Sequence, residues 1–208
     1  GKGPLIDRMP GDEWQRFANL RLMYAYMYTH PGTKLVFMGG EIGQTTEWDH
    51  DQQLRWDLLD FAPNKGIQDL TRDLNNLYKS EAALYENGFT AEGFEWIELN
   101  DHQNSVISYI RKGKHEDDQV AVLCNFTPVV REDYRIGING GEWEEVLNTD
   151  SQKYWGSGIS TSATIVSEDS AQHGRPRSLT VNIPPLGAVI LQKKTMAKPA
   201  AKAKPQAK

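Results

Sequence analysis

The feature that most constrains this 208-residue sequence is a change of pattern near residue 88. Beyond that point the chain consists of short runs rich in β-branched and aromatic residues, separated by Gly, Asn, Asp and Pro. The runs are FEWIEL, SVISYIR, QVAVLCNF, DYRIGI, EWEEVLN, TIVS, SLTVNI and GAVILQ. Short strands without intervening helices predict an antiparallel β-sandwich over residues 89–193.

The first 88 residues have a helical pattern instead. Apolar residues recur three and four positions apart between Asp12, a favourable N-cap, and Pro31. A second helix is predicted from Gly66 to the Asn87-Gly88 stop. Between them KLVFMGG, residues 34–40, is apolar on both faces and too short for a helix, which predicts a buried parallel strand. That strand would need neighbouring strands from outside this chain.

Composition indicates a globular chain, with 38% hydrophobic and 10% aromatic residues. The net charge is −5, but the last sixteen residues hold six Lys and no acid, which leaves 17 basic against 28 acidic residues elsewhere. An acidic body argues against nucleic acid as a partner. The Lys/Ala/Pro-rich tail, residues 194–208, is predicted to be disordered.

The cellular location of the protein is predicted from two features of the sequence. No run approaches the roughly 20 apolar residues of a membrane helix, so no membrane partner is expected. The single cysteine, Cys124, lies in the apolar run VAVLCNF and is predicted to be a core residue, which fits the reducing cytoplasm. The chain begins at Gly1 rather than Met, and we interpret it as a fragment.

The loop that follows the predicted strand, EIGQTTEWDHD, gathers acids, a histidine and a tryptophan. It lacks the spacing of an HExxH or EF-hand motif, so no metal is predicted. Trp48 and Trp56 could stack on the apolar face of a sugar while carboxylates bind its hydroxyls. Alternatively, the tryptophans pack the loop and the acids are merely solvated. Phosphate-loop and nucleophile-elbow motifs are absent from the sequence.

Several longer stretches together resemble the C-terminal part of bacterial glycogen branching enzymes, the 1,4-α-glucan branching enzymes of the α-amylase superfamily. They are GKGPLIDRMPGDEWQRFANLR, KLVFMGGEIGQTTEWDHDQQLRW, GFEWIELND, NFTPVVREDYRIGI, LNTDS and HGRPRSLTVNIPPLGAVIL. The resemblance covers about residues 1–192. It implies an α/β plus all-β chain. Residues 1–88 would be the C-terminal portion of a (β/α)8 barrel (helix 7, strand 8, helix 8), and residues 89–193 the antiparallel β-sandwich.

The resemblance also implies the reaction. The family cleaves an α-1,4 link, holds the cut chain as a covalent glycosyl-enzyme and transfers it to a 6-hydroxyl as an α-1,6 branch. This chemistry needs no cofactor, and the implied partners are α-glucan and the upstream part of the same enzyme. The family's nucleophile Asp, acid/base Glu and third Asp precede the position of Gly1. No catalytic residue is therefore carried over, and the chain alone is expected to be inactive.

Substrate-binding candidates are what the resemblance does carry over. In the family the loop after the eighth strand borders the active-site mouth, and the matching residues here are Glu41, Gln44, Glu47, Trp48, Asp49, His50 and Asp51. Leu59 and Trp96 match positions of surface glucan contact. Trp96 could instead be a core residue, since Phe94 and Trp96 share one side of a strand.

Two other functions stay open. One is a related hydrolase of the same superfamily, which would release reducing sugar without forming α-1,6 links. The other is a non-catalytic glucan-binding module, in which the sandwich holds the glucan through Trp96, Trp143 or Trp155.

Overall fold

The eight strands predicted from the sequence are all present in the computed structural model, which describes residues 3–162 and 164–194. A six-stranded antiparallel sheet has the order β1-β2-β3-β8-β5-β6, and β4 pairs with β7 in a second sheet. The strands are β1 (Phe94–Asp101), β2 (Val106–Lys112), β3 (Gln119–Asn125), β4 (Arg131–Ile138), β5 (Glu142–Asn148), β6 (Thr164–Val166), β7 (Arg177–Ile183) and β8 (Gly187–Lys193). The predicted antiparallel sandwich is confirmed.

Helices form the other part of the chain. They are α1 (Glu13–Thr29), α2 (Ala62–Ser80) and α3 (Ala82–Tyr85), with short 3-10 turns η1 (Leu5–Arg8), η2 (Gly40–Ile42), η3 (Trp56–Asp60), η4 (Ala91–Gly93) and η5 (Gln152–Tyr154). The Asp12 carboxylate caps α1 by accepting from the Gln15 N–H at 2.9 Å, as the sequence predicts. The second helix starts earlier than predicted, at Ala62, because Pro63 fits its first turn.

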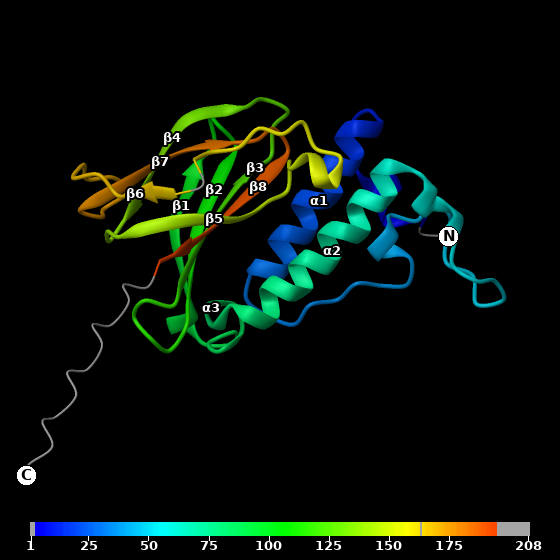
Figure 1. Ribbon diagram of the computed structural model, residues 1–208, viewed down its shortest axis with the longest axis horizontal. Coiled ribbons are helices and arrows are strands. Elements are labelled where there is room, and N and C mark those ends of the chain that lie inside the picture. Colours follow the sequence, from blue (N-terminus) through cyan, green and yellow to red (C-terminus); the bar gives the residue numbers. More distant parts are fainter. Residues whose placement is uncertain (1–2, 163, 195–208) are drawn as a thin grey trace, which may run out of the picture.

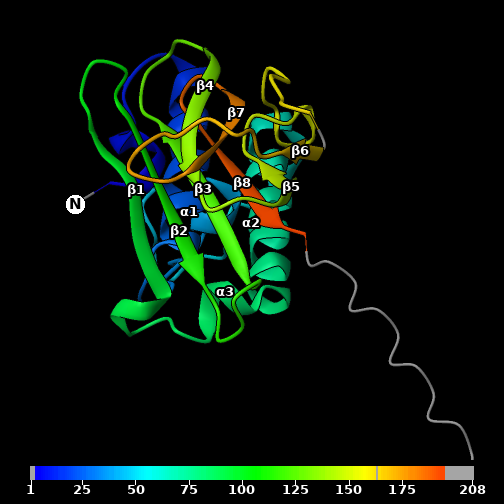
Figure 2. The ribbon, with the colours of Figure 1, turned by 90° about the vertical axis from the view of Figure 1, so that its left-hand side faces the viewer.

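The elements stack in three layers, with α1 and α2 on one face of the larger sheet and β4–β7 on the other (Figures 1 and 2). Alternate residues of β3 serve the two interfaces. Val122 and Cys124 pack toward the helices, whereas Ala121 and Leu123 pack toward β4–β7. Cys124 is fully buried, which confirms its predicted core position, and burial raises the pKa of its thiol to about 12.

The helices and the larger sheet pack together in one hydrophobic core, and the two sheets enclose a second one. Arg111 of β2 is fully buried, and its guanidinium donates to the carbonyl oxygens of Thr29, Leu84 and Gly93 at 2.6, 3.1 and 3.0 Å. These carbonyls belong to the end of α1, to α3 and to η4. One planar, five-donor side chain therefore ties three segments to the sheet. The division at residue 88 marks a change of secondary structure within a continuous packing unit.

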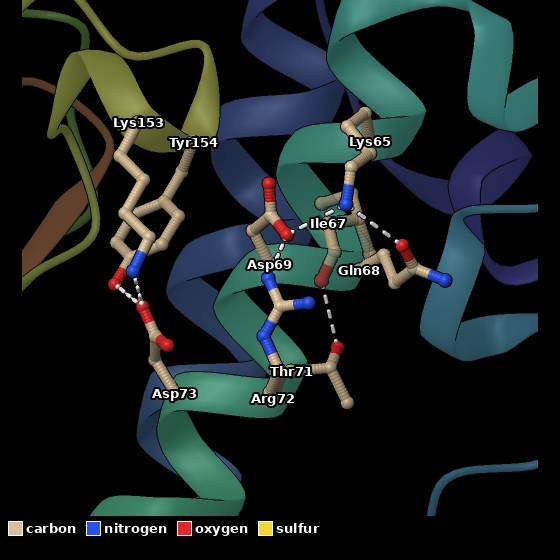
Figure 3. Close-up of polar contacts among 9 residues, drawn as sticks. All are labelled: Lys65, Ile67, Gln68, Asp69, Thr71, Arg72, Asp73, Lys153 and Tyr154. Atoms are coloured by element: carbon tan, nitrogen blue, oxygen red, sulfur yellow. Dashed lines mark hydrogen bonds and ion pairs between the residues drawn. The ribbon is translucent and has the colours of Figure 1, made fainter.

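A second tie joins α2 to η5 (Figure 3). Lys153 Nζ and Tyr154 Oη both donate to Asp73 Oδ2 at 2.5 Å. Gly66, nearer the start of α2, lies so close to η5 that a Cβ there would be 2.5 Å from the Tyr154 carbonyl oxygen. The absence of a side chain at Gly66 lets the helix approach the sandwich backbone.

The buried strand predicted for residues 34–40 is wrong for this structure. Residues 33–37 form no strand, and Leu35, Phe37 and Met38 are 76, 59 and 51% exposed. A parallel strand needs hydrogen-bonding neighbours on its edges, and every pairing among the described strands is antiparallel. Only the helices of the predicted barrel portion are formed, so the barrel itself is not seen.

Two further expectations concern membrane-spanning helices and the C-terminal tail. Among helices in residues 3–162 and 164–194, none combines the length and apolarity that crossing a membrane requires. The tail predicted as disordered lies, beyond Lys194, outside the described residues.

Candidate functional site

The polar loop at residues 41–56, here termed the rim loop, projects from the helical end of the molecule on the side away from the sheets (Figure 1). Gln44 closes its base. This side chain is only 7% exposed, its Nε2 donates to the Thr46 carbonyl at 3.1 Å, and its Oε1 accepts from the Arg55 N–H at 3.1 Å. Of the predicted binding candidates, Gln44 is therefore the one that holds the loop together.

The start of the rim loop is anchored to both long helices. Tyr24 of α1 donates its hydroxyl to the Gly40 carbonyl at 2.7 Å, and Asn64 of α2 donates to the carbonyls of Ile42 and Gly43 at 2.8 and 3.1 Å. Gly43 has a φ of 59°, a left-handed conformation that favours glycine. Glu41 is half-buried here. Burial of Tyr24 is the largest cause that raises the pKa of its hydroxyl, and the charge of Glu41 is the next.

Trp48 gives the loop its apolar surface. Its indole is 39% exposed and meets the ring of Phe37 edge-to-face, with centroids 5.6 Å apart. Both rings border a depression of about 480 Å³, whose apolar wall also includes Leu20, Tyr24 and Met38. The sequence did not reveal Phe37 as part of this surface, because its apolar run predicted a buried strand. An exposed aromatic pair of this kind can stack on the C–H face of a sugar.

The remaining predicted rim residues, Glu47, Asp49, His50 and Asp51, are all exposed. The two Asp49 oxygens accept from the Asp51 N–H at 3.0 Å and from Gln52 Nε2 at 3.1 Å. His50 Nε2 lies 3.3 Å from an Asp51 oxygen. Asp49, His50 and Asp51 offer ligand atoms within 4.8 Å of one another. Because these groups are exposed and Asp49 already stabilises the turn, they do not define a metal centre, and the absence of a metal stays a prediction.

Two candidates lie outside the rim loop. Leu59 is half-buried in η3, directly after the loop. Trp96 is half-buried on the helix-facing side of β1, in a ring cluster with Phe94, Tyr109 and His30 at centroid distances of 4.9, 5.7 and 6.4 Å. None of these ring partners belongs to the rim loop, so Trp96 contributes to packing first and is separate from the other candidates.

Two tryptophans proposed for the binding-module alternative are placed unfavourably. Trp143 is fully buried between the two sheets, which makes its assignment to glucan contact wrong. Trp155 is half-buried and its ring meets Phe17 of α1 edge-to-face at 5.7 Å. Side chains alternate between the two faces of β5, and Trp143 lies on the inner face. The sequence alone does not show which of the two faces is the inner one.

The β-sandwich matches a known domain family. Residues 96–194 match the family described as alpha amylase, C-terminal all-beta domain. Among solved structures, Ttha1563 from Thermus thermophilus matches 92% of this chain and 34% of that chain, with a TM-score of 0.61 and 17% identity. The maltogenic amylase from S. marinus matches 93% of this chain and 22% of that chain, with a TM-score of 0.55 and 16% identity. The match to this domain family covers just under half of the chain, and the solved structures share its fold.

The more specific likeness is to branching enzymes. The sequence is 50% identical over 193 residues to the 1,4-alpha-glucan branching enzyme of Aquifex aeolicus, a match that covers 92% of this chain and 31% of that enzyme. The predicted resemblance to bacterial branching enzymes is thereby confirmed. The chain spans less than a third of the length of this relative.

Proposed function

We propose that this chain is the C-terminal portion of a 1,4-α-glucan branching enzyme of glycogen biosynthesis. The observation that carries the proposal is the 50% identity to such an enzyme over 193 residues, against 16 and 17% for the solved structures that share the fold. In this proposal residues 1–88 are the last part of the (β/α)8 barrel. The nucleophile and acid/base carboxylates lie in the upstream part of the protein, so the chain alone is inactive.

The exposed apolar run supports a role for that upstream part as a partner. Leu35, Phe37 and Met38 are more than half exposed although their sequence is that of a buried strand. In the whole protein, neighbouring parallel strands would supply the hydrogen bonds that this run lacks here, and would cover its side chains. The rim loop would then leave the C-terminal end of a barrel strand, where sites of such barrels are built.

The substrate in this proposal is an α-glucan, which the rim loop contacts beside the catalytic carboxylates. Trp48 and Phe37 provide a surface for a sugar ring, and the exposed carboxylates of Glu47, Asp49 and Asp51 accept hydrogen bonds from hydroxyls. Glu41, His50, Leu59 and Trp96 stay candidates for further contacts, while Gln44 holds the loop. A cytoplasmic location also stays a prediction.

Product analysis of the whole protein tests the reaction. Incubated with amylose, it should create α-1,6 linkages, measured by ¹H NMR and by debranching, without a matching rise in reducing ends. A rise in reducing ends without α-1,6 linkages would instead establish the related hydrolase. The 208-residue chain in the same assay should form no branches, and branching by this chain alone would overturn its inactivity.

Trp48→Ala in the whole protein tests the rim loop. Removing an aromatic face that a sugar ring covers forfeits about 1.5–3 kcal/mol of apolar burial, so we expect KM for amylose to rise by about tenfold or more. The matched control is Phe126→Ala, which removes an aromatic ring 47% exposed on the sandwich. Equal KM values for the two variants would exclude Trp48 from substrate contact.

The glucan-binding-module alternative is favoured by a single observation, the partial exposure of Trp96. Its test is retardation of the 208-residue chain by amylopectin in a native gel. Trp96→Phe keeps ring packing against Phe94 and Tyr109, whereas an alanine there would also open the ring cluster. Retardation that Trp96→Phe abolishes would support the module, and retardation unchanged by it would exclude this residue.

A further inference from the structure

Asparagine is followed directly by glycine at two places in the chain, and the structure gives the two pairs different surroundings. Asn87-Gly88 lies between α3 and η4. Asn139-Gly140 lies in the connection from β4 to β5, which carries the chain from the smaller sheet to the larger one (Figure 1). The difference matters because the peptide nitrogen of a glycine can attack the side-chain carbonyl of the asparagine before it.

This reaction needs only the chain and water. The glycine nitrogen gives up its proton and forms a bond to the asparagine Cγ, and the side-chain nitrogen leaves with that proton as ammonia. Glycine favours the attack because no side chain shields its backbone. Water then opens the cyclic imide. Opening at Cγ gives aspartate, and opening at the main-chain carbonyl gives isoaspartate, whose main chain runs through Cβ and Cγ.

At Asn87 the fold holds both reacting groups. The side-chain Nδ2 donates to the carbonyl oxygens of Lys112 and Gly113 at 3.4 and 3.0 Å. Gly88 is buried, and its N–H donates to the Tyr85 carbonyl at 3.3 Å. Attack on the Asn87 side chain would have to break these hydrogen bonds first, which raises the barrier to cyclisation.

At Asn139 the same groups are accessible. Its side chain is exposed and makes no hydrogen bond within residues 3–162 and 164–194. The Gly140 N–H likewise has no acceptor in the part of the chain that the structure describes. Gly140 and Gly141 have φ of 114 and 103°, a region that glycine enters without steric cost. Nucleophile and carbonyl are therefore both unengaged, in a turn built from two glycines.

The turn is also joined to the core. The Gly140 carbonyl accepts from Trp143 Nε1 at 3.2 Å, and the Gly141 carbonyl accepts from the Ser167 N–H at 3.0 Å. Trp143 is fully buried between the two sheets. Isoaspartate at position 139 would lengthen the main chain directly before these two carbonyls, so the change would reach the tryptophan through its hydrogen bond.

We propose that Asn139 is a site of spontaneous deamidation, at which the folded chain converts to isoaspartate and aspartate, and that the fold protects Asn87 from the same reaction. Each conversion replaces a neutral amide by a carboxylate and adds one negative charge to the sandwich. The isoaspartyl product displaces the contact between the turn and Trp143. The proposal does not depend on the branching reaction.

The test is incubation of the 208-residue chain at neutral pH and physiological temperature, followed by brief tryptic digestion. Tryptic peptides 136–153 and 80–111 carry the two sites, and electron-transfer fragmentation distinguishes isoaspartate from aspartate at each. In the folded chain, isoaspartate should form at Asn139 about tenfold or more faster than at Asn87, because only Asn87 must lose hydrogen bonds. In urea, where those bonds are lost, the two rates should approach each other.

Asn139→Gln is the matched control, because its longer amide cyclises far more slowly. This variant should show no conversion at position 139 and an unchanged rate at Asn87. In the ¹⁵N-labelled parent chain, the Trp143 indole N–H signal should move as isoaspartate accumulates, and it should stay fixed in the incubated variant.

The proposal is overturned by a folded chain in which Asn139 stays unmodified, or in which the two sites convert at equal rates. A Trp143 indole signal that does not move in the isoaspartyl chain would refute the displacement of its contact with Gly140.

Discussion

At the scale of single residues, Arg111 is the side chain on which most of the helix-to-sheet attachment depends. It is fully buried and donates to three backbone carbonyls from three segments. Arg111→Lys keeps the charge but offers one compact ammonium group, which cannot reach all three acceptors. Because unsatisfied buried acceptors are costly, we expect the free energy of unfolding to fall by about 2–4 kcal/mol.

Urea unfolding followed by circular dichroism measures this loss. The matched control is Arg72→Lys on α2, where the arginine side chain is 54% exposed and, among the residues the structure describes, pairs with Asp69 alone. That change should alter the unfolding free energy by about 0.5 kcal/mol or less. A loss at Arg111 no larger than that of the control would show that the three carbonyls are satisfied by other means.

At the scale of elements, the contact between α2 and η5 predicts an inverted glycine effect. Gly→Ala inside an exposed helix normally stabilises it by about 1 kcal/mol. At Gly66 the added Cβ would lie 2.5 Å from the Tyr154 carbonyl oxygen, so the helix must move away from η5. We expect Gly66→Ala to lower the unfolding free energy by about 1–3 kcal/mol.

Asn76→Ala is the control for helix propensity, because Asn76 is exposed on the same helix. Thermal unfolding of both variants should give a higher Tm for Asn76→Ala and a lower Tm for Gly66→Ala. If Gly66→Ala raised the Tm, α2 would not be packed against η5 as the structure has it.

Elements also show how far the sequence could predict the structure. All eight strands and the start of α1 follow from local signals, namely alternation, turn residues and the Asp12 cap. The run at residues 34–40 carries an equally clear local signal and forms no strand, because a strand also needs partners that local sequence cannot supply.

The candidate site was predictable to a similar degree. The composition of the rim loop identified Trp48 and the acids beside it as exposed groups that can meet a ligand. The burial of Gln44 beneath the loop depends on hydrogen bonds to Thr46 and Arg55, which composition does not reveal.

At the scale of the whole molecule, the junction between the helical layer and the sheet contains a histidine, and this predicts a pH dependence of stability. His30 ends α1 and packs against Phe94 and Tyr109. Burial lowers the pKa of His30 from its usual 6.5, and the charges of Lys34 and Arg111 lower it further, against an opposing hydrogen bond to the Pro31 carbonyl.

The direction follows from proton linkage. Because the folded state holds His30 neutral, the unfolded chain binds more protons once the pH falls below 6.5, and stability is lost from that point downward. Carboxylates with lowered pKa, such as Glu95 beside Lys112, lose their contribution only below their usual value of 4.5, in a separate window. We therefore expect the Tm to fall between about pH 7.5 and about pH 5.5.

His30→Phe removes the contribution of His30 and leaves that of His173, whose pKa is also lowered by burial, since the phenyl ring keeps the aromatic packing and cannot be protonated. The fall in Tm between the two pH values should be smaller in this variant than in the parent chain. His102→Phe, at an exposed position in the β1–β2 turn, should leave the parent's pH dependence intact. If the His30→Phe curve paralleled that of the parent, acid sensitivity would have to come from groups other than the histidine at the helix–sheet junction.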